Sequence, residues 1–542
     1  LAVMGPSGCG KSTLLKALCG DSPPSSGSVY MLGFEFNSHY DFLKTQIGYV
    51  PQDDIVHREL TIDQSLYYAA KLRMPQATEA NIREKIDEVL RELKIDHIRD
   101  SLVGKISGGQ RKRVSIAVEI LTDPMILFLD EPTSPLDPQT IEEFLGILRR
   151  LSKKGTTVIT VTHKPGDLEY MDSVIFMAEG GHIAYQDSVD ACLDYFKVAS
   201  IPKVYGLLEG EMATPWIEKW KRTMGGDTSG ASSPQVIEKG KSNPFLQYRW
   251  LTQRYFNIKL NDKMSTAVMI GQAPIIAALI CIIFSKVTPA VPFLIAICAI
   301  WFGASNAARE IVGELPIYKR ERMFNQGILP YIFSKITVLG VFSAIQAVLF
   351  AGILSLFYST DSDTSVAWND PFMTFSWMLT ISIASLMMGL LLSAIANTSE
   401  KVMTIVPIAL IPQIMLAGVV APIQSKFVEF LSYITLSRWG TEGLSIIQEN
   451  VVVPAGDVQQ VEGTGVLGAD NMPIDPEFEI ITKDSVMDAA SNLNTQFHES
   501  YSNFGELQNT LTLDAAAMGI LTLIFFIGIY IALKRKDPIK IK

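Results

Sequence analysis

The hydrophobic residues of the chain follow two different patterns. Up to about residue 200, short apolar runs of strand length alternate with amphipathic stretches of helical period, which predicts an α/β domain. After about residue 262, six runs of 19 to 25 residues contain no Asp, Glu, Lys or Arg. An α-helix of this length crosses a bilayer core of ~30 Å. Buried core helices of a soluble protein are the alternative, but six such runs in one half favour an all-α six-helix transmembrane domain. The six expected spans are 266–285, 287–308, 336–358, 372–396, 402–421 and 515–533.

The charges of the segments between these runs alternate in sign. Arg309, Lys319, Arg320 and Arg322 lie between the second and third runs, and the chain ends in KRKDPIKIK. The segment 359–371 has no Lys or Arg, and 450–512 has ten acidic residues and one Lys. Since basic loops stay on the cytoplasmic side, we expect a multi-pass integral membrane protein whose first half and C-terminus are cytoplasmic. The plasma or inner membrane is the favoured location.

Composition narrows the class of protein further. The 542 residues are 48% hydrophobic and 19% charged, with a net charge of -10. A soluble domain has about 25% charged residues, and an acidic chain is a poor partner for nucleic acid. The five cysteines form no CxxC pair and none lies in an expected outer segment, so we expect neither zinc nor an outer disulfide.

The patterns divide the chain into three segments: the α/β domain over 1–204, a flexible linker over 205–243 and the membrane domain over 244–542. Gly, Ser and charged residues are frequent in 221–243, as in flexible linkers. The stretch 244–262 mixes aromatic with basic residues at helical spacing, which favours a membrane-surface helix. The last helix of the soluble domain is the alternative. Because the chain opens mid-strand with LAVMG and without an initiator Met, we expect that it lacks its N-terminal edge.

A glycine-rich motif follows the first apolar run. It has the form G-x-x-x-x-G-K-[ST] and precedes the helical sequence LLKAL, the context that a phosphate loop requires. Its glycines let backbone N–H groups curl around phosphate oxygens, Lys11 neutralises the β- and γ-phosphates, and Ser12 ligates Mg²⁺. ATP and Mg²⁺ are therefore the expected cofactors. The expected ATP-binding residues of this loop are Gly5, Ser7, Gly8, Gly10, Lys11, Ser12 and Thr13.

A second motif, the apolar run MILFLDEP, ends in two carboxylates. Next to a phosphate loop, Asp130 is expected to hold Mg²⁺ directly or through water, and Glu131 to act as the general base on the attacking water. The plainer reading is a buried strand that ends in a polar turn. The phosphate loop upstream favours the catalytic one.

A third motif, Ile106-Ser-Gly-Gly-Gln-Arg-Lys-Arg, is by itself a turn followed by a solvated helix face. Together with Lys11, Gln52, Asp130 and His163 it resembles the LSGGQ signature of ABC ATPases. The resemblance implies that Gln52 senses Mg²⁺ and water, and that His163 contacts the γ-phosphate as a catalytic residue. It also implies that the signature caps a nucleotide held by a second chain. The further ATP-binding residues implied are Ser107, Gly108, Gly109, Gln110 and Asp137 of the D-loop.

Two positions depart from that family pattern. Pro135 stands where the D-loop usually has a small residue, and proline fixes φ and removes an N–H. Leu60-Thr-Ile-Asp-Gln64 stands for the family's L-T-V-x-E, so that an amide replaces a carboxylate. The aromatic residue that stacks on adenine in the family would lie before Leu1, and we expect the chain as it stands to bind ATP poorly.

An ATPase domain that precedes six spans is similar to the G subfamily of ABC transporters, the white-type and multidrug-resistance half-transporters. The charged segment before Tyr331-Ile-Phe-Ser-Lys335 is similar to that subfamily's loop between its second and third spans, and Ser437-Arg-Trp-Gly-Thr-Glu-Gly to its re-entrant region. The resemblance implies that this charged segment forms a coupling helix. The alternative is that its charges serve only to set the orientation in the membrane, which would need Arg and Lys but no Glu. The coupling residues are expected to be Arg309, Glu314, Arg320 and Arg322.

The same resemblance implies a route for cargo. Val419 and Val420 match two bulky apolar residues that plug the outward route, and they are smaller than the leucines common there. Trp301, Phe302 and Asn306 of the second span, with Ile411 and Ile414 of the fifth, are expected to line the inner cavity; ordinary helix packing is the alternative for each. No charged residue lies within any expected span, which suits apolar or amphipathic cargo.

The sequence therefore predicts an ATP hydrolase coupled to transport, exporting lipid-, sterol- or drug-like amphiphiles as a dimer of half-transporters. One chain carries one phosphate loop and one signature, so two complete sites need two chains, and a homodimer is favoured. The alternatives are a nucleotide-gated regulatory subunit without transport, or an exporter of a complex lipid or polysaccharide.

Overall fold

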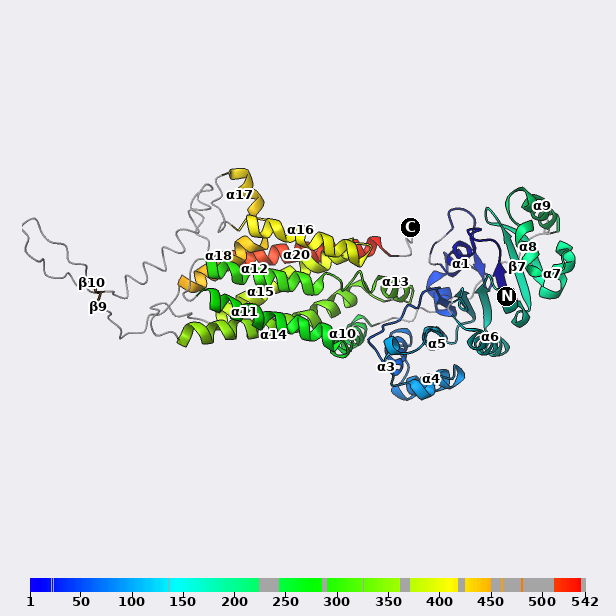
Figure 1. Cartoon of the computed structure of the whole chain (residues 1–542), viewed down its shortest axis with the longest axis horizontal. Helices are drawn as coiled ribbons and strands as arrows, with labels where there is room; N and C mark the ends of the chain where they lie inside the picture. Colours follow the sequence, from blue (N-terminus) through cyan, green and yellow to red (C-terminus); the bar gives the residue numbers. More distant parts are fainter. Residues whose placement is uncertain are drawn as a thin grey trace, which may run out of the picture. The chain divides into compact units, whose positions relative to one another are not determined.

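The computed structural model divides the chain into two compact units (Figure 1). Unit 1 comprises Leu1–Asp262, Pro316–Tyr331 and Lys536–Lys542, and unit 2 comprises Lys263–Leu315 and Ile332–Arg535. The structure describes the whole chain except residues 21, 23, 135, 224–242, 285–289, 325, 361–370, 418–424, 450–459, 462–478, 481–510 and 538–542.

Unit 1 is built around a six-stranded sheet in the order β4-β5-β6-β1-β7-β8. Every neighbouring pair is parallel except β7 with β8. Strand β5 is buried over Leu127–Asp130, as the apolar run that precedes the two carboxylates predicts. The strands are β1 (Ala2–Met4), β4 (Ile47–Val50), β5 (Ile126–Asp130), β6 (Thr157–Val161), β7 (Ser173–Ala178) and β8 (His182–Ser188).

Helices surround this sheet and connect its parallel strands, the arrangement that βαβ crossovers produce. A short hairpin of β2 (Tyr30–Met31) and β3 (Phe34–Glu35) and the turn α2 (Tyr40–Leu43) follow the first of them. The larger helices are α1 (Lys11–Cys19), α3 (Ile62–Arg73), α4 (Glu79–Glu92), α5 (Gly108–Ile120), α6 (Pro138–Lys153), α7 (Val189–Phe196), α8 (Ile201–Leu207) and α9 (Thr214–Thr223).

Side-chain caps determine where three of these helices begin. Thr61 and Gln64 form a capping box at α3, and Ser107 and Gln110 form one at α5. Asp137 caps α6 by accepting from the Thr140 N–H. The amide of Gln64 therefore does locally what a glutamate does at this position, because its Oε1 accepts from the Thr61 N–H at 3.1 Å.

Unit 1 extends beyond the expected boundary at residue 204. Helices α8 and α9 lie within or next to the expected linker, and Leu208 and Ala213 are buried in the same core as Phe176 and Phe196. Trp216 packs on Phe196 with ring centroids 5.0 Å apart. The segment after Val204 is polar in composition, but the few apolar residues just named pack it against the core of unit 1. Only the part over 224–242 lies outside the described residues.

Unit 1 also contains two helices from the part of the chain assigned by sequence to the membrane domain. These are α10 (Pro244–Asn261) and all but the first residue of α13 (Leu315–Met323). Leu251, Tyr255 and Ile258 of α10 are buried, while Phe245, Phe256 and Leu260 are exposed. Asn257 donates to Tyr68 Oη on α3 at 2.5 Å. By its contacts the stretch 244–262 belongs to unit 1, and it keeps an apolar outer side.

Unit 2 is helical, and its two-residue strands β9 (Gln460–Val461) and β10 (Glu479–Ile480) pair with each other. Five helices are long and apolar enough to cross a membrane among the described residues, so the chain is a multi-pass membrane protein. They are α11 (Lys263–Ile283), α12 (Ala290–Ala307), α14 (Ile328–Thr360), α15 (Pro371–Ile395) and α20 (Leu511–Arg535). The remaining helices are α16 (Ser399–Met415), α17 (Lys426–Ser432) and α18 (Leu436–Glu449).

The expected fifth span, 402–421, is covered in part by α16. This helix has 17 residues and contains Pro407 and Pro412. It ends before 418–424, so Val419 and Val420, the expected plug, lie outside the described residues.

Helices α12 and α15 form the centre of unit 2, and glycine makes their close approach possible. A Cβ at Gly303 of α12 would collide with the Ser382 carbonyl oxygen of α15, and a Cβ at Gly389 of α15 would collide with the Ala304 carbonyl. Small residues at such crossings let helix backbones approach closely where no hydrophobic driving force acts between them.

Candidate nucleotide site

The glycine-rich loop joins β1 to α1 in unit 1, as the sequence predicts. Gly5, Gly8 and Gly10 have φ of +151°, +80° and +100°, a region that L-residues avoid. A Cβ at Gly5 would also collide with the Met177 carbonyl. The Lys11 ammonium donates to the carbonyls of Gly5 at 2.9 Å and Pro6 at 2.8 Å. The lysine is thereby held over the loop whose N–H groups would surround a phosphate.

The residues expected to hold magnesium lie together. Ser12 Oγ, in the first turn of α1, donates to Asp130 Oδ1 at the end of β5, 3.0 Å away. Burial raises the pKa of Asp130; the Ser12 hydrogen bond opposes this shift and the charge of Glu131 adds to it. A hydroxyl beside a buried carboxylate is a donor set suited to Mg²⁺. The site therefore fits the cation that the motifs imply.

Glu131 lies at the meeting point of the three residues assigned to catalysis. Its Oε2 accepts from Gln52 Nε2 at 3.3 Å, and its Oε1 is 3.5 Å from His163 Nδ1. Its backbone has φ +45°, rare for a residue with a side chain, and its N–H donates to the Val161 carbonyl. Such strain persists where the surroundings determine the conformation, often at functional sites.

The loop that carries His163 is held by a buried carboxylate that the sequence analysis missed. Asp167 accepts from the hydroxyls of Thr133 at 2.8 Å and Thr162 at 2.6 Å. Lys164 Nζ donates to the Thr133 carbonyl at 2.6 Å. These bonds join the segment after Glu131 to the segment around His163. They thereby fix the positions of these two residues relative to each other.

The interpretation of Arg111-Lys112-Arg113 as a solvated helix face is wrong for Lys112 and Arg113, which are both buried. Lys112 Nζ donates to the carbonyls of Pro51 at 3.1 Å and Gln52 at 2.8 Å and lies 3.3 Å from Asp54 Oδ1. The helix that begins at the signature thus holds the backbone of Gln52 directly. A charge pattern alone could not reveal this, because its acceptors are backbone carbonyls far away in the sequence.

The signature occupies the first turn of α5. Ser107 accepts from the Gln110 N–H at 3.2 Å, and a Cβ at Gly109 would lie 2.8 Å from Thr140 Cγ2 of α6. Asp137 accepts from the Thr140 hydroxyl at 2.6 Å, and these bonds lower its pKa. The structure therefore places Asp137 as a helix cap beside the signature. Pro135 lies outside the described residues.

The four expected coupling residues have different surroundings. Arg320 is buried in unit 1 with Nη1 3.5 Å from Glu119 Oε1, and Arg322 pairs with Asp537 at 2.6 Å. In unit 2, Glu314 pairs with Lys335 at 2.6 Å, and Arg309 is exposed. Among the described residues, Arg320 is the one of the four that pairs with a residue of α5, the helix that begins at the signature.

The expected cargo residues also divide. Trp301, Ile411 and Ile414 are exposed on unit 2. Asn306 Nδ2 donates to Gln346 Oε1 at 2.8 Å. Phe302 is 1% exposed and packs against Phe350 with ring centroids 6.0 Å apart, so it belongs to the helix core and does not line an open surface in this chain. The apolar run of α12 could bury either of two faces, and its packing against α14 buries the face that carries Phe302.

Two family models match separate parts of the chain, and the second model includes α13 and most of α10, which by their contacts belong to unit 1. Residues 1–134 match the family model described as ABC transporter, and residues 246–448 match the model described as ABC-2 type transporter. A solved ATP-binding subunit of an ABC transporter is 26% identical, with a TM-score of 0.35, over 38% of this chain and 86% of that one.

One curated relative matches most of the chain, and the two others match a little more than a third of it. The chain is 30% identical over 475 residues to the ABC transporter ATP-binding/permease protein Rv1747 of Mycobacterium tuberculosis, a match that covers 81% of this chain and 53% of that protein. It is 41% identical over 212 residues to ABC transporter G family member 28 of Arabidopsis thaliana, covering 37% and 19%. It is 39% identical over 208 residues to the Broad substrate specificity ATP-binding cassette transporter ABCG2 of Rattus norvegicus, covering 36% and 31%. The chain thus spans about half of the first relative and less of the others.

Proposed function

Because the chain is an ABC transporter polypeptide, an ABC ATPase domain followed by an ABC-2 type membrane domain, we propose that it couples ATP hydrolysis to the export of amphipathic molecules. The convergence of Gln52 and His163 on Glu131, beside the Ser12–Asp130 pair, carries the proposal. A chain kept only to sense nucleotide would have no need of an intact base with its two partners in place.

The roles follow from the contacts. Bound Mg²⁺ would neutralise phosphate charge, with Ser12 and Asp130 as its protein ligands. Glu131 accepts the proton of the attacking water, Gln52 orients that water, and His163 orients the carboxylate and the γ-phosphate. Lys11 and the loop N–H groups stabilise the charge that develops on the transferred phosphoryl group.

We propose that two chains act together. The signature lies at the N-terminus of α5, and a helix N-terminus is an arrangement that binds phosphate. One chain supplies one phosphate loop and one signature, so that two complete sites require a second chain, for which a copy of this one suffices.

The cargo class follows from the exposed apolar surface of unit 2. Trp301, Ile411 and Ile414 present large apolar side chains, and Asn306 adds an amide beside Gln346. Such a surface suits lipid-, sterol- or drug-like amphiphiles with few polar groups. The name of the rat relative, which refers to broad substrate specificity, is consistent with this class.

The test is Glu131→Gln in the full-length protein in lipid nanodiscs. We expect ATP binding within about twofold of wild type and hydrolysis reduced at least about 100-fold, the usual contribution of a general base. Glu142→Gln, an exposed change on α6, is the matched control and should hydrolyse ATP at the wild-type rate. Unchanged turnover in Glu131→Gln would refute the assigned base. A wild-type protein that binds but never hydrolyses ATP, with any cargo, would favour a regulatory subunit.

A further inference from the structure

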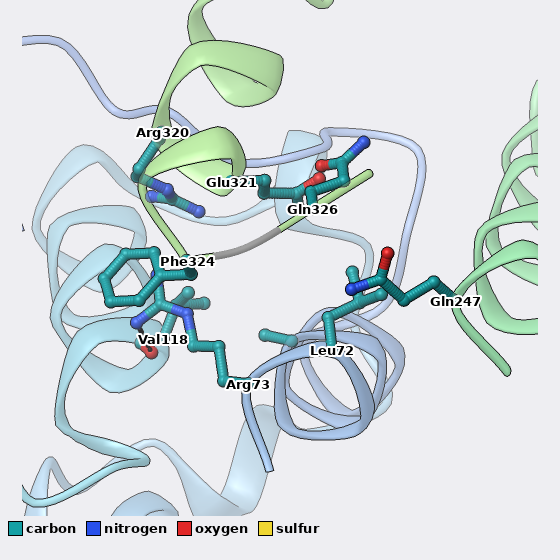
Figure 2. A pocket seen from close by; sticks show the side chains of 9 residues that line it. Leu72, Arg73, Val118, Gln247, Arg320, Glu321, Phe324 and Gln326 are labelled. Carbon is teal, nitrogen blue, oxygen red and sulfur yellow. Dashed lines mark hydrogen bonds between the residues drawn. The ribbon is translucent and has the colours of Figure 1, made fainter. Parts of the chain in front are cut away.

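A cavity in unit 1 lies among α3, α5, α10 and α13, outside the nucleotide site (Figure 2). It has about 330 Å³ of open space, a volume that includes its mouth. Arg320 and Phe324 lie on one side, Gln247 on the other, and Glu321 and Gln326 lie near the top of the view. Ala69, Leu72, Arg73 and Val118 complete the lining.

Positive charge exceeds negative charge around this cavity. Glu119 is fully buried and its carboxylate is already occupied: it accepts from Arg73 at 2.8 and 3.1 Å and from the Tyr49 N–H at 3.3 Å. Glu321 is occupied in the same way by Arg254, whose Nη2 is 2.9 Å from Oε2. Arg320 is the third guanidinium against these two carboxylates, so the cluster carries one excess positive charge.

Among the described residues, Arg320 and Gln326 are the two lining side chains with buried polar atoms that make no hydrogen bond, although Arg320 Nη1 lies at ion-pair distance from Glu119, 3.5 Å from Oε1. Arg320 is 7% exposed and Gln326 is 2% exposed. Within the described part of the chain, Nε and Nη1 of Arg320 and both amide atoms of Gln326 have no hydrogen-bond partner. Burial lowers the pKa of Arg320; the charge of Glu119 opposes this shift, and that of Arg73 reinforces it. Leaving such groups unsatisfied in a protein interior destabilises the folded state, and most strongly when the group is charged.

We propose that this cavity is a binding site for a phosphate monoester or hydrogen phosphate, held by Arg320 and Gln326. The Arg320 guanidinium provides charge and N–H donors for phosphate oxygens. The amide of Gln326 has a free donor and a free acceptor, and a protonated phosphate offers both an oxygen and an O–H. Chloride offers no donor, and sulfate carries no proton at neutral pH, so both satisfy only half of the amide.

Two sources can supply this group: phosphate free in solution, or the headgroup of phosphatidic acid. The proposed phosphate site does not depend on the transport function proposed above, because the experiment measures binding and not transport. The phosphate loop is itself an anion site, so each measurement is made with a non-hydrolysable ATP analogue and Mg²⁺ at saturation. The probes are inorganic phosphate, sulfate at equal ionic strength, and nanodiscs of phosphatidylcholine with or without phosphatidic acid.

The full-length protein, its Arg320→Gln and Gln326→Leu variants and the control Arg83→Gln are compared by calorimetry and thermal unfolding. Arg83 lies on α4, pairs with Asp63 at 2.9 Å and does not line the cavity. We expect saturable phosphate binding, or stabilisation by phosphatidic acid, in wild type and Arg83→Gln, weakened at least tenfold in both cavity variants. Gln326→Leu keeps the charge cluster and serves where Arg320→Gln fails to fold.

The possible results distinguish the source of the phosphate group and test the site itself. Phosphate binding in phosphatidylcholine nanodiscs assigns the free anion, and a response only to phosphatidic acid assigns the lipid headgroup. Equal responses of wild type and Gln326→Leu to phosphate and to phosphatidic acid overturn the site. Sulfate binding as tightly as phosphate overturns the role of the amide of Gln326.

Discussion

At the scale of single residues, the nucleotide site concentrates groups in unfavourable states. Glu131 has a positive φ, and Asp130 is buried with a raised pKa. Both states raise the free energy of the folded protein, and the packing of the surrounding sheet maintains them. Such states are common where chemistry requires a particular geometry.

Asp130→Asn should separate stability from activity. A raised pKa means that the ionised carboxylate destabilises the folded protein at neutral pH, an effect that fades as pH falls and the group protonates. We therefore expect the nucleotide-free variant to melt at a higher temperature than wild type at pH 7, with a smaller difference at pH 5. Hydrolysis that depends on Mg²⁺ should fall at least about 100-fold. A variant that melts several degrees lower would show that the Ser12 hydrogen bond outweighs desolvation.

At the scale of elements, helix α5 connects the signature to the segment that carries Gln52. Its first turn is the signature, Lys112 in its middle holds the backbone of Gln52, and Glu119 near its end accepts from the Tyr49 N–H. Displacement of this helix would therefore move both ends of the segment Tyr49–Gln52, which ends at the glutamine proposed to orient the attacking water.

Lys112→Met tests that connection. The substitution keeps the apolar stem and removes the ammonium, so the carbonyls of Pro51 and Gln52 lose their donor. We expect a loss of about 1–3 kcal/mol in the free energy of unfolding, the cost of buried groups left unpaired. Hydrolysis should fall while ATP binding persists. The exposed Lys105→Met is the control and should change neither property; full activity in Lys112→Met would contradict the role.

The Arg254–Glu321 pair joins α10 to α13 and makes a pH-dependent contribution. Burial by itself would raise the pKa of Glu321, but the charge and hydrogen bonds of Arg254 lower it below its usual value. A lowered pKa gives stability that is present above the unfolded pKa, about 4.3, and lost as pH falls through the folded one. Glu321→Gln should therefore melt lower than wild type from pH 7 to pH 5, with the difference disappearing only below about pH 4.3. Equal melting temperatures at pH 7 would show that the pair does not stabilise this contact.

At the scale of the whole molecule, each chain holds half of every proposed site. Co-expression of wild-type and Glu131→Gln chains in equal amounts tests this. If chains pair at random and both sites must fire, hydrolysis should fall to about one quarter of the wild-type rate, the fraction of wholly wild-type pairs. Co-expression with Glu142→Gln should leave the rate unchanged. A fall to one half would show that each site works independently.

Much of the fold and of the nucleotide site could be predicted from local patterns. The phosphate loop, the carboxylates after β5 and the long apolar helices are contiguous, so their spacing carries the information. The surroundings of Arg320 could not be predicted in this way, because Glu119 lies some 200 positions earlier in the chain. The packing of Ala213 and Trp216 into the core of unit 1 depends on the same kind of information, because their partners Phe176 and Phe196 lie earlier in the chain.

The sequence by itself thus determined the class of chemistry and the membrane character, since both depend on residues that are neighbours along the chain. Only the tertiary structure decided which buried polar groups find partners. It assigned Lys112 to the backbone of Gln52 and Asp167 to two threonines, and it left Arg320 and Gln326 facing a cavity. A buried polar atom must be satisfied by whatever the fold brings beside it, and that neighbour is encoded by the packing of the whole domain.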